Sequence, residues 1–353
     1  MTRPSRPRPA PTVSPEGSTR RARPDVAELY TEARNGGRRA LGRLLTLVER
    51  GGAEADRISE LAHPDSGKAH VVGITGAPGA GKSTLTGQLV SLLVGQGRRP
   101  AILAVDPSSP LSGGAILGDR IRMDDVVDPG GERSLAFIRS MATRGHSGGL
   151  ALAVPLAVRL FDAAGYDPVI IETVGVGQVE VDVVGAADTA LVVVTPGMGD
   201  AVQANKAGLL EVADVFVVNK ADRPGADDVR RDLELMLDLS RVTGKEAANE
   251  YRPPIIMSSA LDGTGAPEVW DAALAHLDYL DSTGRRAARR RHRIRSEIRS
   301  RMEQRLLVMT DRLLASPQGA TVLAEADDGA IPPTTASATL LDALLDGAVD
   351  PSV

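Results

Sequence analysis

The sequence contains no cysteine, few aromatic residues and only five lysines among its 41 basic residues. The absence of cysteine excludes disulfide bonds and thiolate metal sites. The histidines lie at positions 63, 70, 146, 276 and 292, without the spacing of a metal-binding pair. We therefore expect any bound metal ion to be held by oxygen ligands.

Long apolar runs are also absent. No stretch approaches the roughly 18 apolar residues that a membrane-spanning helix needs, and residues 1–24 contain no apolar segment of the signal-peptide kind. An apolar content of 42% with 25% charged residues is ordinary for a soluble globular protein. These features predict a cytoplasmic protein with no membrane contact, and the net charge of −5 argues mildly against nucleic acid as the main partner.

The composition divides the chain into four regions. Residues 1–24 are rich in proline and arginine, which predicts a disordered tail. A transit peptide is the alternative, although the repeated prolines would break the amphipathic helix that such a peptide needs. Residues 25–66 have helical periodicity, residues 67–282 are expected to form one large α/β domain, and residues 283–353 a helical C-terminal extension.

Short β-rich runs alternate with longer amphipathic runs in the large domain. Strands that are apolar on both faces and separated by helices predict a parallel sheet covered by helices on both sides. Ligands of such sheets bind at the carboxyl ends of the strands. The predicted strands are "VVGIT", "AILAVD", "PVIIE", "TALVVVT", "DVFVVN" and "PIIMS", and the predicted helices span 82–96, 148–164, 201–213, 226–241 and 267–280.

A phosphate-binding loop, "GAPGAGKS", follows the first of these strands and opens a helix. This is the context that the motif GxxxxGK[ST] requires, so the fold predicted is that of a P-loop NTPase with a mainly parallel sheet. The glycines allow backbone N–H groups to surround phosphates, Lys82 reaches the terminal phosphates, and the Ser83 hydroxyl is a ligand for Mg²⁺. The candidate phosphate-site residues are Gly76, Ala77, Pro78, Gly79, Ala80, Gly81, Lys82, Ser83 and Thr84.

The base is predicted to be guanine by the run "VVNKAD" at a later strand end. A carboxylate at Asp222 can accept hydrogen bonds from N1–H and the exocyclic amine of guanine, which adenine cannot offer in that arrangement. The loop "SSALDGTG" would add the Ala260 N–H for the guanine carbonyl, with Ser259 bracing Asp222. The candidate guanine-site residues are Asn219, Lys220, Asp222, Ser259, Ala260 and Leu261, and the nucleotides expected are GTP and GDP.

An acidic residue, Glu172, ends the apolar strand "VIIE", and Gly175 follows three residues later. In a P-loop protein this is the position of the carboxylate on the magnesium side, and Gly175 would offer its N–H to the γ-phosphate. Asp106 and Asp119 are further acids near strand ends, although "DP" at 106–107 also fits an ordinary turn. Ser83, Asp106, Asp119 and Glu172 together suit Mg²⁺, a hard cation that keeps some of its water.

Several motifs together resemble one family. The runs "DPSSPLSGGAILGDRIRM", "SMATRGHSGGL", "ETVGVGQVEVDV" and "NKAD", preceded by the helical "LYTEARNGGRRALGRLLTLVE", are similar to the MeaB/ArgK family of methylmalonyl-CoA mutase-associated GTPases, within the SIMIBI class. The resemblance covers residues 25–310, and the acidic motifs at Asp106, Asp119 and Glu172 are specific to the family.

The resemblance implies a homodimeric GTPase that serves an adenosylcobalamin-dependent acyl-CoA mutase. Such a protein gates cofactor loading, protects the mutase from inactivation and is itself stimulated by the mutase. By the matching motifs, residues 197–208 would form an additional switch loop, and residues 283–353 are the candidate dimerisation region. An older label in the family, transport-system kinase, is an alternative, but no motif for a phosphate acceptor supports it.

The predicted catalytic residues are Lys82, Glu172 and Gln178. A self-sufficient GTPase would carry a water-orienting glutamine directly after Gly175 or an arginine in cis, but residue 176 is valine and Gln178 comes two residues later. Arg144 or Arg120 could neutralise charge once loops close. We therefore expect slow turnover by the protein alone, with an increase when a partner orders the switch loops.

Two other classes of function stay open at this level. A nickel metallochaperone GTPase would need a Cys or His platform, which the chain lacks. Residues 284–305 are rich in arginine and could bind nucleic acid, but Glu297 and Glu303 interrupt the charge and no aromatic residue is interleaved for base stacking. A solvated helix packed in a dimer is the favoured interpretation of this segment.

Overall fold

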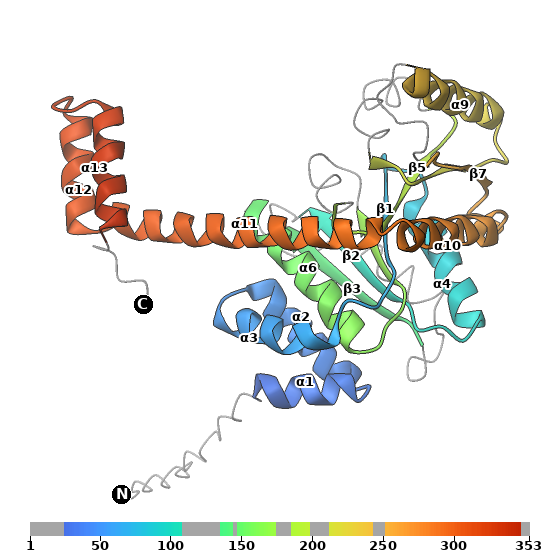
Figure 1. Cartoon of the computed structure of the whole chain (residues 1–353), viewed down its shortest axis with the longest axis horizontal. Helices are drawn as coiled ribbons and strands as arrows, with labels where there is room; N and C mark the ends of the chain where they lie inside the picture. Colours follow the sequence, from blue (N-terminus) through green and yellow to red (C-terminus); the bar gives the residue numbers. More distant parts are fainter. Residues whose placement is uncertain are drawn as a thin grey trace, which may run out of the picture.

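The computed structural model describes residues 25–107, 135–143, 147–173, 185–197, 212–242 and 251–346. Within these residues the core is one parallel sheet of seven strands in the order β3-β2-β4-β1-β5-β6-β7, with helices on both faces (Figure 1). The predicted α/β fold is therefore confirmed. The strands are β1 Val71–Gly76, β2 Ala101–Pro107, β3 Phe137–Thr143, β4 Val169–Thr173, β5 Thr189–Val194, β6 Val215–Asn219 and β7 Ile255–Ser258.

The edge strand β3 was not predicted from the sequence. Its run "FIRSMAT" has three polar residues and a glycine-rich sequence after it, so its local β pattern is weak. Pairing of all seven residues with β2, from Ala101 opposite Phe137 to Pro107 opposite Thr143, makes it a strand. Long-range pairing thus overrides a weak local β pattern.

The central strand β1 alternates its side chains between two apolar layers. Val72 and Ile74 join a core cluster with helices α4 (Lys82–Gly95) and α10 (Ala266–Ser282). Val71 points to the opposite face, into a cluster with α6 (Ser147–Ala163) and the N-terminal helices. A third cluster packs α9 (Ala226–Val242) against β5 and β6. Both faces of the sheet are therefore buried, as the continuous apolar strands require.

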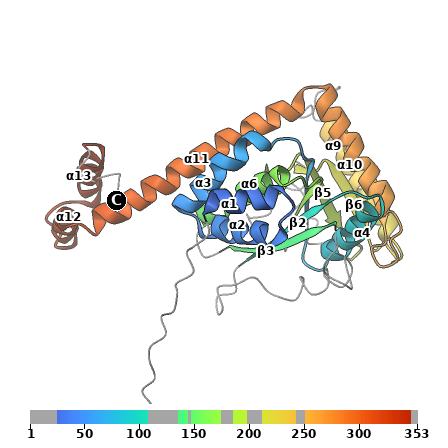
Figure 2. The same ribbon diagram turned by 90° about the horizontal axis from the view of Figure 1, so that it is seen from below.

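Helices also form before and after the sheet (Figures 1 and 2). The N-terminal helices pack beside α6 on one face. Helix α11 starts at α10, passes α6 and projects away from the sheet, and its far end carries the α12–α13 pair. No helix among the described residues is long and apolar enough to cross a membrane. The bounds are α1 Val26–Arg34, α2 Arg38–Arg50, α3 Ala53–Ala62, η1 His63–Asp65, α11 Arg285–Leu314, α12 Pro317–Asp327 and α13 Pro333–Leu345.

Candidate nucleotide-binding site

The loop between β1 and α4 requires glycine at two positions. Gly76 has φ +145° and Gly81 has φ +87°, in the region that favours glycine. A Cβ atom at Gly76 would collide with the Val193 carbonyl oxygen, and one at Gly81 with the Asn219 side chain. Helix α4 then starts without a side-chain cap. Its first backbone N–H groups are left for another acceptor, which is the arrangement of an anion site.

Lys82, the first residue of α4, is buried and curls back into the loop. Its Nζ donates to the carbonyl oxygen of Gly76 at 2.7 Å and to that of Ala77 at 3.1 Å. The ammonium group therefore lies over the loop whose backbone turns around it. It is placed where a phosphate chain in the loop would meet it.

Ser83 and Glu172 meet at the carboxyl edge of the sheet. The Ser83 hydroxyl donates to Glu172 Oε1, and Glu172 is buried in β4, paired in register with Ile74 of β1. Strand pairing thus fixes the carboxylate beside the first turn of α4. The next strand on that side, β2, has Asp106 as its last residue but one, directly after the pairing of Val105 with Thr173.

Asn219 connects the phosphate loop to the loop after β7. Its Nδ2 donates to Ala80 O at 2.7 Å, and its Oδ1 accepts from Ala260 N–H at 3.0 Å. Asn219 is buried, so both bonds are made away from water and hold the two loops at a fixed separation. The sequence predicted Ala260 N–H as a donor to guanine, but here it is engaged by Asn219. Contact with the base carbonyl requires sharing this N–H or a shift of the loop.

The remaining guanine-site candidates lie around the same turn. Lys220 has φ +58°, the one positive value among described non-glycine residues, and its Nζ donates to Gly79 O at 2.7 Å. Asp222 is exposed two residues later. Ser259 is buried in the loop after β7, and its role in bracing Asp222 stays a prediction. Leu261 is 87% exposed at the tip of this loop, a position from which an apolar side chain could cover a base.

Several predicted residues fall outside the described part of the chain. These are Asp119, Gly175 and Gln178, together with Arg120, Arg144 and most of the expected switch loop at 197–208. For Asp106 only the backbone is described. The described residues contain no group of three acidic or histidine side chains arranged around a metal position. The structure therefore brings together Lys82, Ser83, Glu172, Asn219, Lys220 and Ala260, while the other roles stay predictions.

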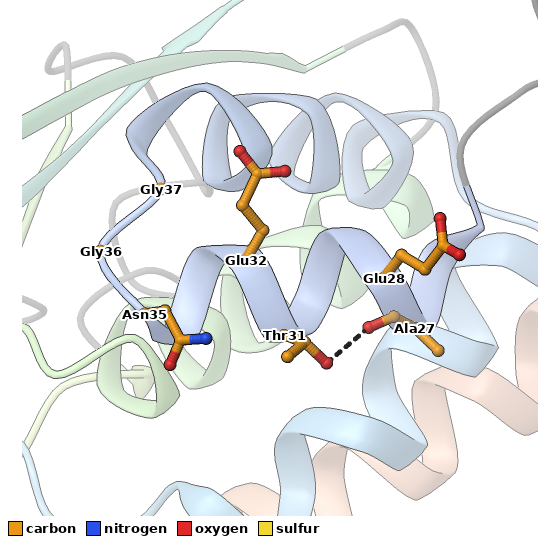
Figure 3. A pocket seen from close by; sticks show the side chains of 7 residues that line it. All are labelled: Ala27, Glu28, Thr31, Glu32, Asn35, Gly36 and Gly37. Atoms are coloured by element: carbon orange, nitrogen blue, oxygen red, sulfur yellow. Dashed lines mark hydrogen bonds between the residues drawn. The ribbon is translucent and has the colours of Figure 1, made fainter.

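A wide hollow of about 820 Å³ lies at the turn between α1 and α2, away from the phosphate loop (Figure 3). Glu28 and Glu32 point to one side of α1, and Thr31 and Asn35 point away from them. The Thr31 hydroxyl already donates a hydrogen bond to the Ala27 carbonyl oxygen, 2.9 Å away. Because its polar groups do not converge, this hollow lacks the features of a small-molecule site.

Comparisons with known proteins agree with the geometry of the phosphate and guanine loops. Residues 41–314 match the model of the family described as "Methylmalonyl Co-A mutase-associated GTPase MeaB". A Pyrococcus horikoshii protein, named only provisionally as a GTPase, is 47% identical over 78% of this chain and 85% of its own length. The mouse protein named "Methylmalonic aciduria type A homolog, mitochondrial" is 34% identical over 78% of this chain and 68% of its own length.

A solved structure is similar across nearly the whole chain. The crystal structure titled "LAO/AO transport system kinase" is 27% identical, with a TM-score of 0.62, and the match covers 90% of this chain and 96% of that one. The family match spans the phosphate loop, the Glu172 strand, the guanine loops and all of α11. This chain belongs to the MeaB family of methylmalonyl-CoA mutase-associated GTPases, which bind GTP and GDP.

Proposed function

We propose that this protein is a GTP-hydrolysing chaperone that gates adenosylcobalamin loading into an acyl-CoA mutase and protects that mutase, with methylmalonyl-CoA mutase as the first candidate. The observation that carries the proposal is the family match over residues 41–314, whose description names this mutase. The name of the mouse relative, which refers to methylmalonic aciduria, supports the same client. Transfer of adenosylcobalamin to the apo-mutase, measured with GTP or GDP present, tests the proposal.

The site geometry supports the nucleotide roles that we assign. Lys82 Nζ would exchange its bonds to Gly76 O and Ala77 O for the terminal phosphates. Asn219 would keep the phosphate and base ends of the site at a fixed distance, since it bonds to both loops. The Lys220 stem would lie over the base, with Asp222 reading its edge.

Mg²⁺ fits the oxygen atoms that the structure places beside the phosphate loop. Ser83 and Glu172 are in contact there, and both offer the hard oxygen donors that Mg²⁺ prefers. Protein sites for Mg²⁺ with nucleotides use one or two carboxylates, with phosphates and water as the other ligands. When bound, the ion would neutralise charge on the phosphates. We assign Ser83 and Glu172 to hold it, with Asp106 and Asp119 as further candidates.

Replacing Glu172 with alanine should leave GDP binding largely intact but slow GTP hydrolysis. The physical reason is that the carboxylate is buried and aligned on Ser83 by strand pairing. We expect the Mg²⁺ concentration for half-maximal hydrolysis to rise by at least about 10- to 100-fold, because the loss of a group that only orients metal ligands already has this effect. Phosphate release measured over a Mg²⁺ titration checks this.

Glu172→Gln is the matched control, because glutamine keeps the shape and can still accept from Ser83 while removing the charge. If charge at this position serves Mg²⁺, both variants shift the Mg²⁺ dependence. If both variants hydrolyse GTP and respond to Mg²⁺ as the wild type does, Glu172 has no role in Mg²⁺ binding or hydrolysis.

A homodimer formed through α11–α13 is also part of the proposal. Ile294, Ile298, Met302 and Leu306 recur every four residues on α11 and are each at least half exposed, so they form one apolar stripe along the helix. Helix α11 has eleven arginines against three acids, whereas residues 317–346 have five acids and no basic residue. A second copy offers both the apolar cover and the opposite charge.

The variant Ile298→Glu with Met302→Glu should convert the dimer to a monomer, since it buries two carboxylates in the proposed interface. Light scattering coupled to size-exclusion chromatography measures the mass directly. Leu235→Glu on α9, where leucine is 61% exposed, is the matched control and should stay dimeric. A monomeric wild-type protein, or a double variant that remains dimeric, would contradict the assignment.

The structure also bears on the nucleic-acid alternative for α11. Arg286, Arg289, Arg290 and Arg293 face the protein body, where they contact backbone carbonyls or buried acids. Four of the eleven arginines of this helix are therefore engaged by groups of the same chain. This argues for a structural role of the arginines rather than phosphate-backbone binding.

A further inference from the structure

The first turns of α11 sit on buried acids at the amino edge of the sheet, the edge opposite to the phosphate loop. Arg289 forms two bonds to the Asp214 carboxylate, at 2.7 and 2.8 Å, and one to the Asp188 carbonyl at 2.6 Å. Arg293 contacts Asp188 Oδ1 at 2.5 Å, and the Asp188 side chain is fully buried. Paired guanidinium and carboxylate groups of this kind fix the first turns of α11, which we call its root, on the sheet. We call the site where these arginines meet Asp188 and Asp214 the seat of α11.

Next to this seat, one threonine hydroxyl lies between two buried imidazoles. Thr189 Oγ1 is 2.9 Å from His70 Nε2 and 3.0 Å from His276 Nδ1. On its other side, His276 Nε2 is 3.2 Å from Asp214 Oδ1. These side chains therefore form a hydrogen-bonded series, which starts beside β1, continues through β5 and α10, and ends at the Asp214 carboxylate that binds Arg289 of α11.

The donors and acceptors in this hydrogen-bonded series determine which nitrogen of each ring carries the proton. A carboxylate only accepts, so His276 Nε2 carries hydrogen and its Nδ1 accepts from the Thr189 hydroxyl. The hydroxyl has one proton, so Thr189 Oγ1 must accept from His70 Nε2–H. His70 Nδ1 is then bare, and it is buried without a partner among the described residues. Each ring is neutral in this arrangement, and a proton added to His276 Nδ1 would oppose the Thr189 donor.

Burial disfavours the protonated form of both rings, and the nearby charges act in both directions. Burial lowers the pKa of His70 to about 4, with Arg286 acting in the same direction and Asp188 and Asp167 against it. Burial also lowers the pKa of His276 to about 4, although Asp214 opposes this. The other charged or titratable groups around the rings are Arg289, Arg290 and Arg293 of α11, Tyr251 before β7, and Tyr279 of α10.

Asp188 keeps its charge over the same range of pH. Burial by itself would raise the pKa of Asp188, but Arg293, Arg286 and the Val71 N–H lower it below its usual value. As pH falls, the imidazoles therefore gain protons before this carboxylate does. The seat has more guanidinium than carboxylate groups, so each added proton makes it more positive.

We propose that the hydrogen-bonded series His70–Thr189–His276 is a proton-sensitive latch: it holds the root of α11 on the sheet while both rings are neutral, and their protonation releases the root while the sheet stays folded. Because α11 leads to the α12–α13 pair, the latch would control where these helices lie relative to the GTPase site. The inference does not depend on the mutase or on the dimer.

The direction of the pH effect follows from linkage. A released ring has a pKa near 6.5, higher than in the seated state, so release takes up protons. The seated state keeps its full stability above about pH 6.5, and loses it as pH falls towards the lower, seated pKa. The ratio of seated to released protein should fall roughly tenfold per pH unit for each ring in this window.

The single tryptophan of the chain, Trp270, reports on the latch. Its ring centroid is 5.8 Å from that of His70, and a protonated imidazole at this distance quenches indole fluorescence. We would titrate the full chain from about pH 7.5 to about pH 4 and follow fluorescence, far-UV circular dichroism and hydrogen exchange of α11 and β1. The expected result is quenching together with faster exchange in the first turns of α11, at a pH where β1 remains protected.

His70→Gln keeps a donor at the position of Nε2 and removes the titrating group, so it should weaken the fluorescence and exchange transitions. The matched control is His292→Gln, at an exposed position on α11, and it should behave as wild type. In the wild-type protein, nitrogen NMR should show His70 as the Nε2–H tautomer, which keeps the test valid if a variant does not fold. Loss of β1 protection at the same pH as α11, unchanged transitions in His70→Gln, or either ring titrating near 6.5 would overturn the latch.

Discussion

Replacing Asp222 with asparagine is expected to weaken GTP binding by on the order of 2 to 4 kcal/mol, the range for losing one partner of a charged hydrogen-bonded pair. The Asp222 carboxylate is exposed after the turn at Lys220, where it can accept from N1–H and the amine of guanine. An amide at this position would instead donate to a carbonyl. The preference should therefore shift towards xanthosine triphosphate.

Calorimetric titration of both nucleotides against both proteins measures this shift. Asp232→Asn is the matched control, because Asp232 is an exposed acid on α9 outside the candidate site. It should bind GTP as the wild type does. Unchanged GTP affinity in Asp222→Asn would remove Asp222 from the guanine site.

The second large effect is expected on hydrolysis. The chain has valine directly after Gly175 and lacks the water-orienting glutamine expected there, so the protein alone should turn over slowly. Binding of a mutase to the switch loops would order them, because the free energy of binding offsets the entropy lost on ordering. We therefore expect phosphate release to rise when the mutase is added, and a coupling of about 1 to 3 kcal/mol between nucleotide and mutase would change their binding affinities roughly 5- to 150-fold.

The nucleotide state should also change the affinity for the mutase, because linkage between two binding sites is reciprocal. Titrating labelled protein with mutase in GTP and in GDP measures this difference. Equal affinities in both states would mean that the nucleotide does not control the partner.

The sequence predicted the parallel sheet because its central strands are apolar on both faces. Val71, Val72 and Ile74 are all buried, whichever face they point to. Strand β3 was missed because it is an edge strand, and its pattern is set by pairing with β2 rather than by burial on both faces. Local propensity carries little information at such positions.

The motif spacing placed the phosphate and guanine loops on the correct strand ends, but it could not predict the bonds between them. Ala260 N–H donates to Asn219 across 41 residues of chain. Arg289 and Arg293 of α11 reach acids 75 and 105 residues away, so the sequence shows a basic helix without showing which of its sides faces inward. Contacts of this separation depend on the packing of the whole domain.

The most direct test of the central claim is phosphate release by the purified protein, alone and with candidate acyl-CoA mutases. Lys82→Ala serves as the control that removes the ammonium from the phosphate loop, and Lys68→Ala, at an exposed position outside the site, serves as its match. We expect slow release by the protein alone, stimulation by one mutase in the wild type and in Lys68→Ala, and little release in Lys82→Ala. Slow release that no acyl-CoA mutase changes, with tight binding to none of them, would contradict the central claim.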